Sequence, residues 1–232
     1  IKEDLYQSGI EYLKLDKPPL IDDFFDNIHQ WINGGNLNDF RVHLINKLTR
    51  DISLPPKIYQ LAKSHIHWIV GNELAMQRSC NLSIQIPQDS SSLLPLHSDV
   101  WSGNSPYEIV LWLPFVNCYR TKSMFVLPKY ETDRITSHFS EYASMNAEDL
   151  FHQIQDQLHW LEVPYGHGVI FTHALLHGNR INEEDQTRWA LNIRFKALLS
   201  PYGDKELGES FIPVTIRPMT RMGYHYKKTT LQ

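Results

Sequence analysis

A histidine and an aspartate stand two positions apart in the stretch Leu96-His97-Ser98-Asp99. If this stretch is extended, alternate side chains point to the same side, so His97 and Asp99 project together. One imidazole and one carboxylate are two of the three ligands in the facial triad that holds non-haem Fe(II) and leaves coordination positions open. The pattern therefore predicts a metal site that is completed by a histidine from elsewhere in the chain.

Three histidines in a later segment could complete that site. His177 is followed by Gly178 and comes about 80 residues after His97, while His167 and His173 precede it. His173 shares the parity of His177 if the segment is a regular strand, so both side chains would face the same way. His177 is the predicted third ligand, and the residue pattern leaves His173 and His167 as alternatives.

Two arginines are predicted to point to the side of the metal. Arg188 and Arg194 have the same parity in an apolar run over 188–198 that reads as a strand. A guanidinium that faces a protein interior is costly without an anion, and its planar fork matches a carboxylate. The strand therefore predicts a bound carboxylate, held by Arg188 or Arg194. The alternative is a salt bridge to an acidic residue at the rim.

The N-terminal third reads as helical. Apolar residues recur at three- and four-residue spacing over 21–32, before Gly34-Gly35, and further helices are expected over 38–49 and after Pro55-Pro56. An irregular lead-in is expected up to Pro18-Pro19. The third helix should place its apolar side chains on one face (Ile58, Leu61, Ala62 and Ile69). His65 and His67 lie in this helix, where their side chains diverge, so they are not expected to bind a metal.

From Cys80 the hydrophobic period changes to two, which is typical of strands. Strands are expected over 81–86, 93–100, 107–115, 124–127, 161–163 and 169–171, around His177, and over 188–198. A helical insertion is expected over about 131–160, with Asn146 as an N-cap. The interpretation is one domain: a helical part over 1–79, a barrel of short strands over 80–199, and an unassigned tail over 200–232. Three polar residues of the first strand are expected to face the barrel interior (Asn81, Ser83 and Gln85).

Composition narrows the function classes. The 232 residues are 42% hydrophobic and 21% charged, with a net charge of −4, which argues against a nucleic-acid-binding surface. No run of eighteen apolar residues is present, so no membrane span is expected, and no secretory signal is visible. Cys80 and Cys118 are the only cysteines and make neither a disulfide scaffold nor a zinc cluster. We therefore expect a reducing, cytoplasmic compartment and a small-molecule partner.

The order of these blocks resembles a known family. His97-Ser98-Asp99, the run Glu108-Ile109-Val110-Leu111-Trp112, the strand ending Leu127-Pro128, and Gly168-Val169-Ile170-Phe171 before His177-Gly178 and Arg188 follow one another. This order is similar to the Fe(II)/2-oxoglutarate-dependent dioxygenases, in particular their phytanoyl-CoA dioxygenase-like branch. The ending Arg188-Trp189-Ala190-Leu191-Asn192-Ile193-Arg194 is also similar to StrG-like oxygenases of carbohydrate and aminoglycoside clusters. The match covers residues 80–196.

The resemblance implies a fold, a cofactor set and residue roles. The fold would be mainly β with flanking helices, a double-stranded β-helix (a cupin-like jelly roll). His97, Asp99 and His177 would hold Fe(II), which with 2-oxoglutarate and O₂ would oxidise a substrate. Arg188 would bind the distal carboxylate of 2-oxoglutarate, with Arg194 as the alternative, and Trp112 would pack over it.

The family pattern is not matched everywhere. Pro128-Lys129-Tyr130-Glu131 replaces a typical Pro-Gly-Ser-His turn, and His167 stands where the family has aspartate. Neither position carries a ligand in the family. Halogenating relatives have a small residue at the position of Asp99, so the resemblance implies hydroxylation, with desaturation and epimerisation as variants on the same ligands.

The substrate is the least constrained part of the interpretation. Family analogy suggests a carbohydrate or an antibiotic-like intermediate, and Trp101 lies beside small polar residues that suit a sugar ring. Basic and aromatic residues of the tail could bind a phosphate, or could form a solvated tail (Arg217, Arg221, Tyr224, Tyr226, Lys227 and Lys228). Two other functions stay open: a cupin-type metalloenzyme that does not use 2-oxoglutarate, and a non-catalytic jelly roll that binds a small ligand.

Overall fold

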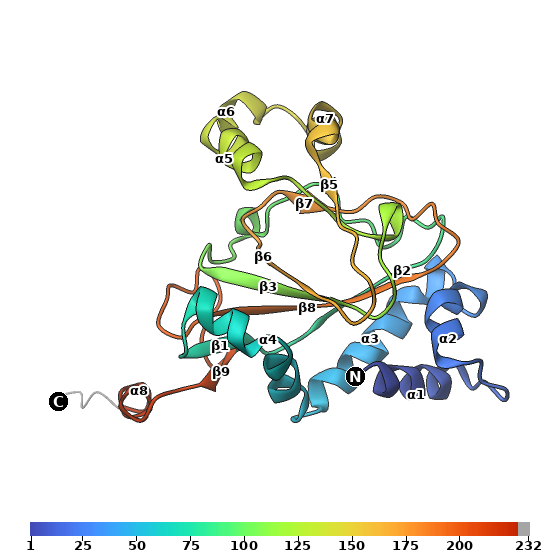
Figure 1. Cartoon of the computed structure of the whole chain (residues 1–232), viewed down its shortest axis with the longest axis horizontal. Coiled ribbons are helices and arrows are strands. Elements are labelled where there is room, and N and C mark those ends of the chain that lie inside the picture. Colours follow the sequence, from blue (N-terminus) through green and yellow to red (C-terminus); the bar gives the residue numbers. More distant parts are fainter. Residues whose placement is uncertain (227–232) are drawn as a thin grey trace.

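The computed structural model describes residues 1–226 as two antiparallel β-sheets with helices outside them (Figure 1). The helices are α1 (Lys2–Leu13), α2 (Ile21–Asn27), α3 (Gly34–Arg50), α4 (Leu54–Val70), α5 (Lys129–Ser137), α6 (Phe139–Tyr142), α7 (Ala147–Ile154) and α8 (Pro218–Tyr224). The strands are β1 (Leu74–Gln77), β2 (Asn81–Gln85), β3 (Glu108–Pro114), β4 (Phe125–Val126), β5 (His159–Trp160), β6 (Val169–Thr172), β7 (His177–Gly178), β8 (Arg188–Ala197) and β9 (Phe211–Thr215).

Strand β8 is the centre of the larger sheet. The sheet has the order β6-β3-β8-β1-β9, and β2 also pairs with β8. One edge of β8 pairs with β3, while β2 and β1 pair in turn with the two halves of its other edge. The smaller sheet has the order β5-β4-β7. In Figure 1 it lies between the larger sheet and helices α5 and α7.

The side chains of β8 alternate between two environments. Trp189, Leu191, Ile193 and Phe195 are fully buried in the main hydrophobic core. Trp189 packs on aromatic side chains from the N-terminal helices and donates its indole N–H to the Phe25 carbonyl at 2.9 Å. The alternate positions therefore face the other sheet, because successive strand side chains point to opposite faces.

The N-terminal helices differ in length from the prediction: α3 is longer than the expected 38–49, whereas α2 ends at Asn27 rather than at residue 32. The expected lead-in forms helix α1, whose Leu5 is buried. Gly34 and Gly35 begin α3 rather than ending a helix, because the Asn33 side chain accepts a hydrogen bond from the Gly35 N–H at 2.9 Å and caps the new helix. The predicted helical run over 21–32 does end before this glycine pair, but the pair itself begins the next helix.

Helix α4 has a different buried face from the predicted one. Ile58 and Ala62 are buried as expected, but Leu61 is 64% exposed and Ile69 is 45% exposed. Tyr59 and Ile66 are buried in their place. The backbone of Ala62 is non-helical, which rotates the second half of the helix relative to the first. The prediction assumed a straight helix, so the residue spacing identified only part of the buried face.

Two strands form in segments for which the sequence predicted no strand. Strand β1 lies inside the predicted helical part over 1–79, and β9 lies inside the unassigned tail, where it pairs with β1. The predicted strand over 161–163 is displaced to β5, and Val163 makes only an isolated bridge with Cys118. The helical insertion forms α5, α6 and α7, and Asn146 caps α7 as predicted by accepting the N–H groups of Glu148 and Asp149.

The predicted strand over 93–100 does not form as a continuous strand. His97 makes an isolated antiparallel bridge with His177, Ser98 is extended, and Asp99 begins a short 3₁₀ helix, η2 (Asp99–Ser102). The pairing stops because the Asp99 N–H turns to the carbonyl of His173 instead of continuing along a partner strand.

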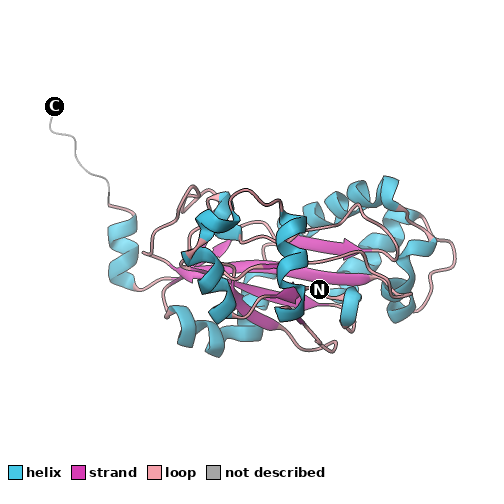
Figure 2. Cartoon of the chain, turned by 90° about the horizontal axis from the view of Figure 1, so that it is seen from above, coloured by secondary structure: helices cyan, strands magenta, loops and turns pink. Residues whose placement is uncertain are grey.

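Helix α8 stands at one end of the molecule, away from the N-terminus (Figure 2). Cys80 and Cys118 are both unpaired and buried. No helix among residues 1–226 combines the length and the apolar character needed to cross a membrane.

The packing predicts very different costs for two tryptophans. Trp189 is fully buried, whereas Trp68 of α4 is 88% exposed. We expect Trp189→Ala to lower the free energy of unfolding by about 3–5 kcal/mol, because it leaves a large cavity between sheet and helices. Trp68→Ala should cost about 0.5 kcal/mol or less. Urea unfolding followed by circular dichroism measures both, and equal costs would contradict the described packing.

Candidate metal and carboxylate site

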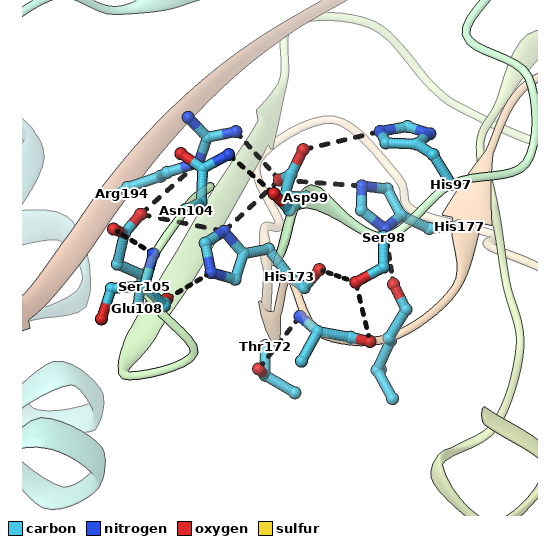
Figure 3. A network of polar contacts seen from close by, with 12 residues as sticks. His97, Ser98, Asp99, Asn104, Ser105, Glu108, Thr172, His173, His177 and Arg194 are labelled. Atoms are coloured by element: carbon cyan, nitrogen blue, oxygen red, sulfur yellow. Dashed lines mark hydrogen bonds and ion pairs between the residues drawn. The ribbon is translucent and has the colours of Figure 1, made fainter. Parts of the chain in front are cut away.

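The structure brings His97, Asp99 and His177 together. One ligand atom from each side chain can be chosen so that all three lie within 4.8 Å of one another. His97 Nε2 is 3.5 Å from Asp99 Oδ1, and His177 Nε2 is 4.0 Å from Asp99 Oδ2. Figure 3 shows both imidazoles turned toward the same carboxylate. The predicted ligands therefore converge, although Asp99 begins a 3₁₀ helix rather than continuing a strand.

Backbone pairing positions these ligands. His97 and His177 exchange two N–H···O=C hydrogen bonds of 2.9 Å, which places the two imidazoles side by side with ring centres 4.4 Å apart. The Asp99 N–H donates to the His173 carbonyl at 3.1 Å. Two short segments, 97–99 and 173–177, are thus held to each other by main-chain hydrogen bonds, and the ligand geometry follows from their register.

Each ligand histidine is held in one tautomer. His97 Nδ1 lies 2.7 Å from the Pro95 carbonyl, and His177 Nδ1 lies 2.8 Å from the Leu175 carbonyl. A carbonyl only accepts, so each Nδ1 carries the proton and donates it. Each Nε2 therefore keeps its lone pair toward Asp99. A carbonyl partner on the second nitrogen is the usual way in which a metal-binding imidazole is oriented.

The charges also suit a cation. Burial lowers the pKa of His177 to about 4, so this imidazole is neutral at pH 7. Burial works to raise the pKa of Asp99, but its contacts with His173, His97 and Arg194 together hold that pKa well below the usual range. A neutral imidazole and an ionised carboxylate are the forms that bind a metal.

The two alternative histidines lie outside the converging group. His173 is fully buried, and its Nε2 donates to the Ser105 carbonyl at 2.7 Å. Its Nδ1 lies 3.4 Å from Asp99 Oδ2, the oxygen that also accepts a hydrogen bond from Arg194. His167 is exposed in the turn before β6. Among the described residues, the group that could hold a metal contains His177 and neither alternative.

Arg194 is engaged with the candidate metal ligand itself. Its Nη2 donates to Asp99 Oδ2 at 2.9 Å, and its Nε is 3.9 Å from the buried carboxylate of Glu108 (Figure 3). The guanidinium thus occupies one oxygen of Asp99 and leaves the other toward His97. Sequence reasoning missed Glu108, because it reads as part of an apolar strand.

Arg188 is buried without a counter-ion. It is 3% exposed, and its guanidinium donates to the Ser123 carbonyl at 2.8 Å and to the Ser83 hydroxyl at 2.9 Å. Its Nε has no hydrogen-bond partner, and no carboxylate of residues 1–226 forms a salt bridge with it. Burial lowers the pKa of Arg188 to about 10, so it remains a cation at pH 7. A buried cation of this kind is stabilised by a bound anion.

The ligand group and Arg188 line one cavity of about 540 Å³. Trp112, Asn192 and Arg194 line it from β3 and β8, which pair with each other in the larger sheet. Asn81 and Ser83 line it as predicted, but Gln85 is not among the lining residues, since its amide donates to the Arg180 carbonyl. Trp112 is 2% exposed and lies at the wall where the resemblance places it.

Other candidate residues lie away from this cavity. Trp101 packs against Phe139 of α6 in a tilted arrangement, with ring centres 5.2 Å apart, and does not line the cavity. Arg217 precedes α8, and its N–H donates to Glu73. Neither it nor the other described basic and aromatic residues of the tail line the cavity (Arg221, Tyr224 and Tyr226). Lys227 and Lys228 lie outside the described residues.

Comparison with known structures defines the fold. No protein-family model matches the sequence, and no curated protein matches it. The chain is similar to the non-haem monooxygenase ThoJ in its nickel complex, with a TM-score of 0.52 and 16% identity over 94% of this chain and 76% of that one. It is also similar to HygX from Streptomyces hygroscopicus with nickel and 2-oxoglutarate bound (TM-score 0.50, 12% identity, 89% and 81% covered). EctD from S. alaskensis matches with a TM-score of 0.50 and 13% identity over 68% of this chain and 59% of that one.

These likenesses confirm the predicted fold class. The chain has a core of antiparallel sheets with flanking helices and has the double-stranded β-helix, or jelly-roll, fold of the non-haem iron oxygenases. At 12–16% identity they establish the fold and leave the chemistry to the residues of this chain.

The geometry distinguishes the three histidines. We expect His177→Ala to weaken Mn(II) binding by about 100-fold or more, because it removes one ligand atom of three. His167→Ala, an exposed change ten residues earlier, should leave the affinity unchanged. The electron paramagnetic resonance signal of free Mn(II) measures both. Equal affinities in the two variants would exclude His177 as a ligand.

Proposed function

We propose that the protein is an Fe(II)- and 2-oxoglutarate-dependent oxygenase that hydroxylates a small molecule. One observation carries the proposal: a three-ligand metal group and a buried arginine without a counter-ion line the same cavity. The metal group alone would suit many metalloenzymes. Arg188 adds a second requirement, a carboxylate that is bound in the same cavity as the metal.

2-Oxoglutarate meets both requirements. Its 2-oxo and C1-carboxylate oxygens can bind a metal that His97, Asp99 and His177 coordinate on one face. Its distal C5 carboxylate would pair with Arg188, which Ser83 and Ser123 hold in place. O₂ would be the other co-substrate. HygX, which shares the fold, has been solved with nickel and 2-oxoglutarate bound.

The residues of this chain divide the work of such a reaction. Fe(II), 2-oxoglutarate and O₂ together supply an oxidant that removes hydrogen from a substrate C–H, while 2-oxoglutarate becomes succinate and CO₂. Arg188 and Trp112 would fix the co-substrate, and Arg194 would hold Asp99 so that one carboxylate oxygen faces the metal. Arg194 is therefore assigned to the metal ligand rather than to the C5 carboxylate.

The finer assignments belong to the same proposal. The phytanoyl-CoA dioxygenase-like branch and the similarity to StrG-like oxygenases rest on the sequence blocks between residues 80 and 196. A carbohydrate or antibiotic-like biosynthetic intermediate is the proposed substrate, and nucleic acids and membranes are not proposed as partners. A cytoplasmic location is proposed from the two unpaired, buried cysteines.

Anaerobic titration of the metal-free protein tests the proposal. Addition of Fe(II) and then 2-oxoglutarate should produce the weak visible charge-transfer band of the chelate, and only when both are present. Iron binding without the band would favour a cupin-type enzyme that does not use 2-oxoglutarate. Absence of iron binding would favour a non-catalytic jelly roll.

Arg188 should decide the affinity for the co-substrate. We expect Arg188→Gln to raise the 2-oxoglutarate concentration needed for half of the band by at least about tenfold, or about 1.4 kcal/mol, because the C5 carboxylate loses its charged partner. Fe(II) affinity in the absence of 2-oxoglutarate should not change. Arg78→Gln, which removes an exposed arginine that donates to the Gly208 and Glu209 carbonyls, is the control. An unchanged 2-oxoglutarate requirement in Arg188→Gln would remove this role from Arg188.

A further inference from the structure

A third arginine, Arg41 of α3, lines the cavity from the helical layer. It is half-buried, and its Nη2 donates to the side-chain oxygen of Asn38, one turn earlier, at 2.7 Å. No acidic side chain of residues 1–226 forms a salt bridge with it, whereas Arg194 is paired with Asp99. Asn38 is neutral, so it orients the guanidinium of Arg41 without neutralising it.

The charges that line the cavity do not balance. The lining side chains include three guanidinium groups (Arg41, Arg188 and Arg194) and one carboxylate (Asp99), and Glu108 adds a second carboxylate beside Arg194, so these groups carry a net charge of 3 − 2 = +1. A divalent metal and the two carboxylates of 2-oxoglutarate cancel each other, so the loaded cavity keeps this excess. A confined positive excess concentrates anions and favours their binding. Since 2-oxoglutarate would place its carboxylates at the metal and at Arg188, Arg41 would remain without a counter-ion.

A second feature of the same cavity lacks a partner. Ser92 is 9% exposed and lines the cavity, and its hydroxyl makes no hydrogen bond with any described residue. Its carbonyl is held by Asn179, which also holds the backbone at Leu94. The segment is therefore fixed, with one buried hydroxyl left for a ligand. A buried hydroxyl is normally satisfied by a hydrogen bond.

The lining also includes apolar side chains. Val42 and Ile45 of α3 and Leu93 and Leu94, which follow Ser92, line the cavity. A ligand that satisfies this lining has an anionic group at one end and an uncharged body that buries apolar surface.

We propose that Arg41 binds an anionic group, a carboxylate or a phosphate ester, of the primary substrate. The inference rests on the proposed function, since it assigns 2-oxoglutarate to Arg188 and the metal. It narrows the substrate to small molecules that carry a negative charge in addition to the C–H group that reacts. Arg41 is then a specificity-determining residue on an element outside both sheets.

Model anions test this assignment on the protein loaded with Mn(II) and saturating 2-oxoglutarate. The probes are phenyl phosphate and benzoate, with phenol as the neutral match. Mn(II) in the site should speed the nuclear relaxation of a probe that binds in the cavity. We expect faster relaxation for at least one anion and no change in relaxation for phenol. The anion with the larger relaxation effect indicates whether the site prefers a phosphate or a carboxylate.

Variants on one helix identify the residue responsible. Arg41→Gln should reduce the relaxation effect at least fivefold, and Arg41→Lys should restore part of it. Arg50→Gln, an exposed change at the end of the same helix, should leave it unchanged. An equal effect in wild type and Arg41→Gln would mean that the anion binds elsewhere, for example directly to the metal, and would overturn the proposal. The absence of a relaxation effect from either anion would also overturn the proposal.

The same samples separate this inference from the proposed function. The Fe(II)–2-oxoglutarate band should form equally in wild type and Arg41→Gln, since Arg41 contacts neither component. If the band forms and the anions do not bind, the inference about Arg41 fails alone. If the band fails in wild type, the proposed function fails and the inference fails with it.

Discussion

Burial of both faces of β8 is the constraint on which the rest of the structure depends. One face carries Trp189, Leu191, Ile193 and Phe195 against the N-terminal helices. The other carries Arg188, Asn192 and Arg194 into the cavity. Because strand side chains alternate strictly, the apolar face fixes the direction of the polar one. A shift of one residue would place the arginines among the aromatic side chains, so packing of the core protects the register of the site.

The polar face of β8 is costly to bury, and the neighbouring elements reduce that cost differently along its length. Asp99 and Glu108 surround Arg194 with negative charge, so its charge is compensated within the chain. Arg188 has only a carbonyl and a hydroxyl as partners. The pairing of Arg194 stabilises the position of Asp99. Arg188 has no carboxylate partner within the chain, so a bound carboxylate would gain a charge-assisted interaction with it. Under the proposed function, this one strand would supply both a support for the candidate metal ligand Asp99 and a binding site for an anion.

The metal ligands could be predicted because the signal is chemical and local. His97 and Asp99 converge although the strand expected over 93–100 is absent, since only residues 97–98 need to be extended for both side chains to turn the same way. His177 was the predicted third ligand, and its pairing with His97 in the fold separates it from His173, which has the same parity in the sequence. Glu108 and Arg41 were missed for a related reason: one is a charge inside an apolar strand, and the other is a charge on an amphipathic helix. The α4 face was wrong because a local break at Ala62 changes the phase of the helix.

Helix α3 belongs to two parts of the molecule at once. Phe40 packs on Trp189 in the main core, and the next residue, Arg41, lines the cavity. The N-terminal helices are therefore part of both the hydrophobic core and the cavity lining. Cutting the chain back to its strands would remove the part of the cavity lining that α3 supplies, together with the helical residues of the main core. Because α3 lines the cavity, substitutions on one face of this helix can change which ligands the cavity binds without changing the candidate metal ligands. Related chains could therefore differ in substrate through side chains of a helix that supplies no candidate metal ligand.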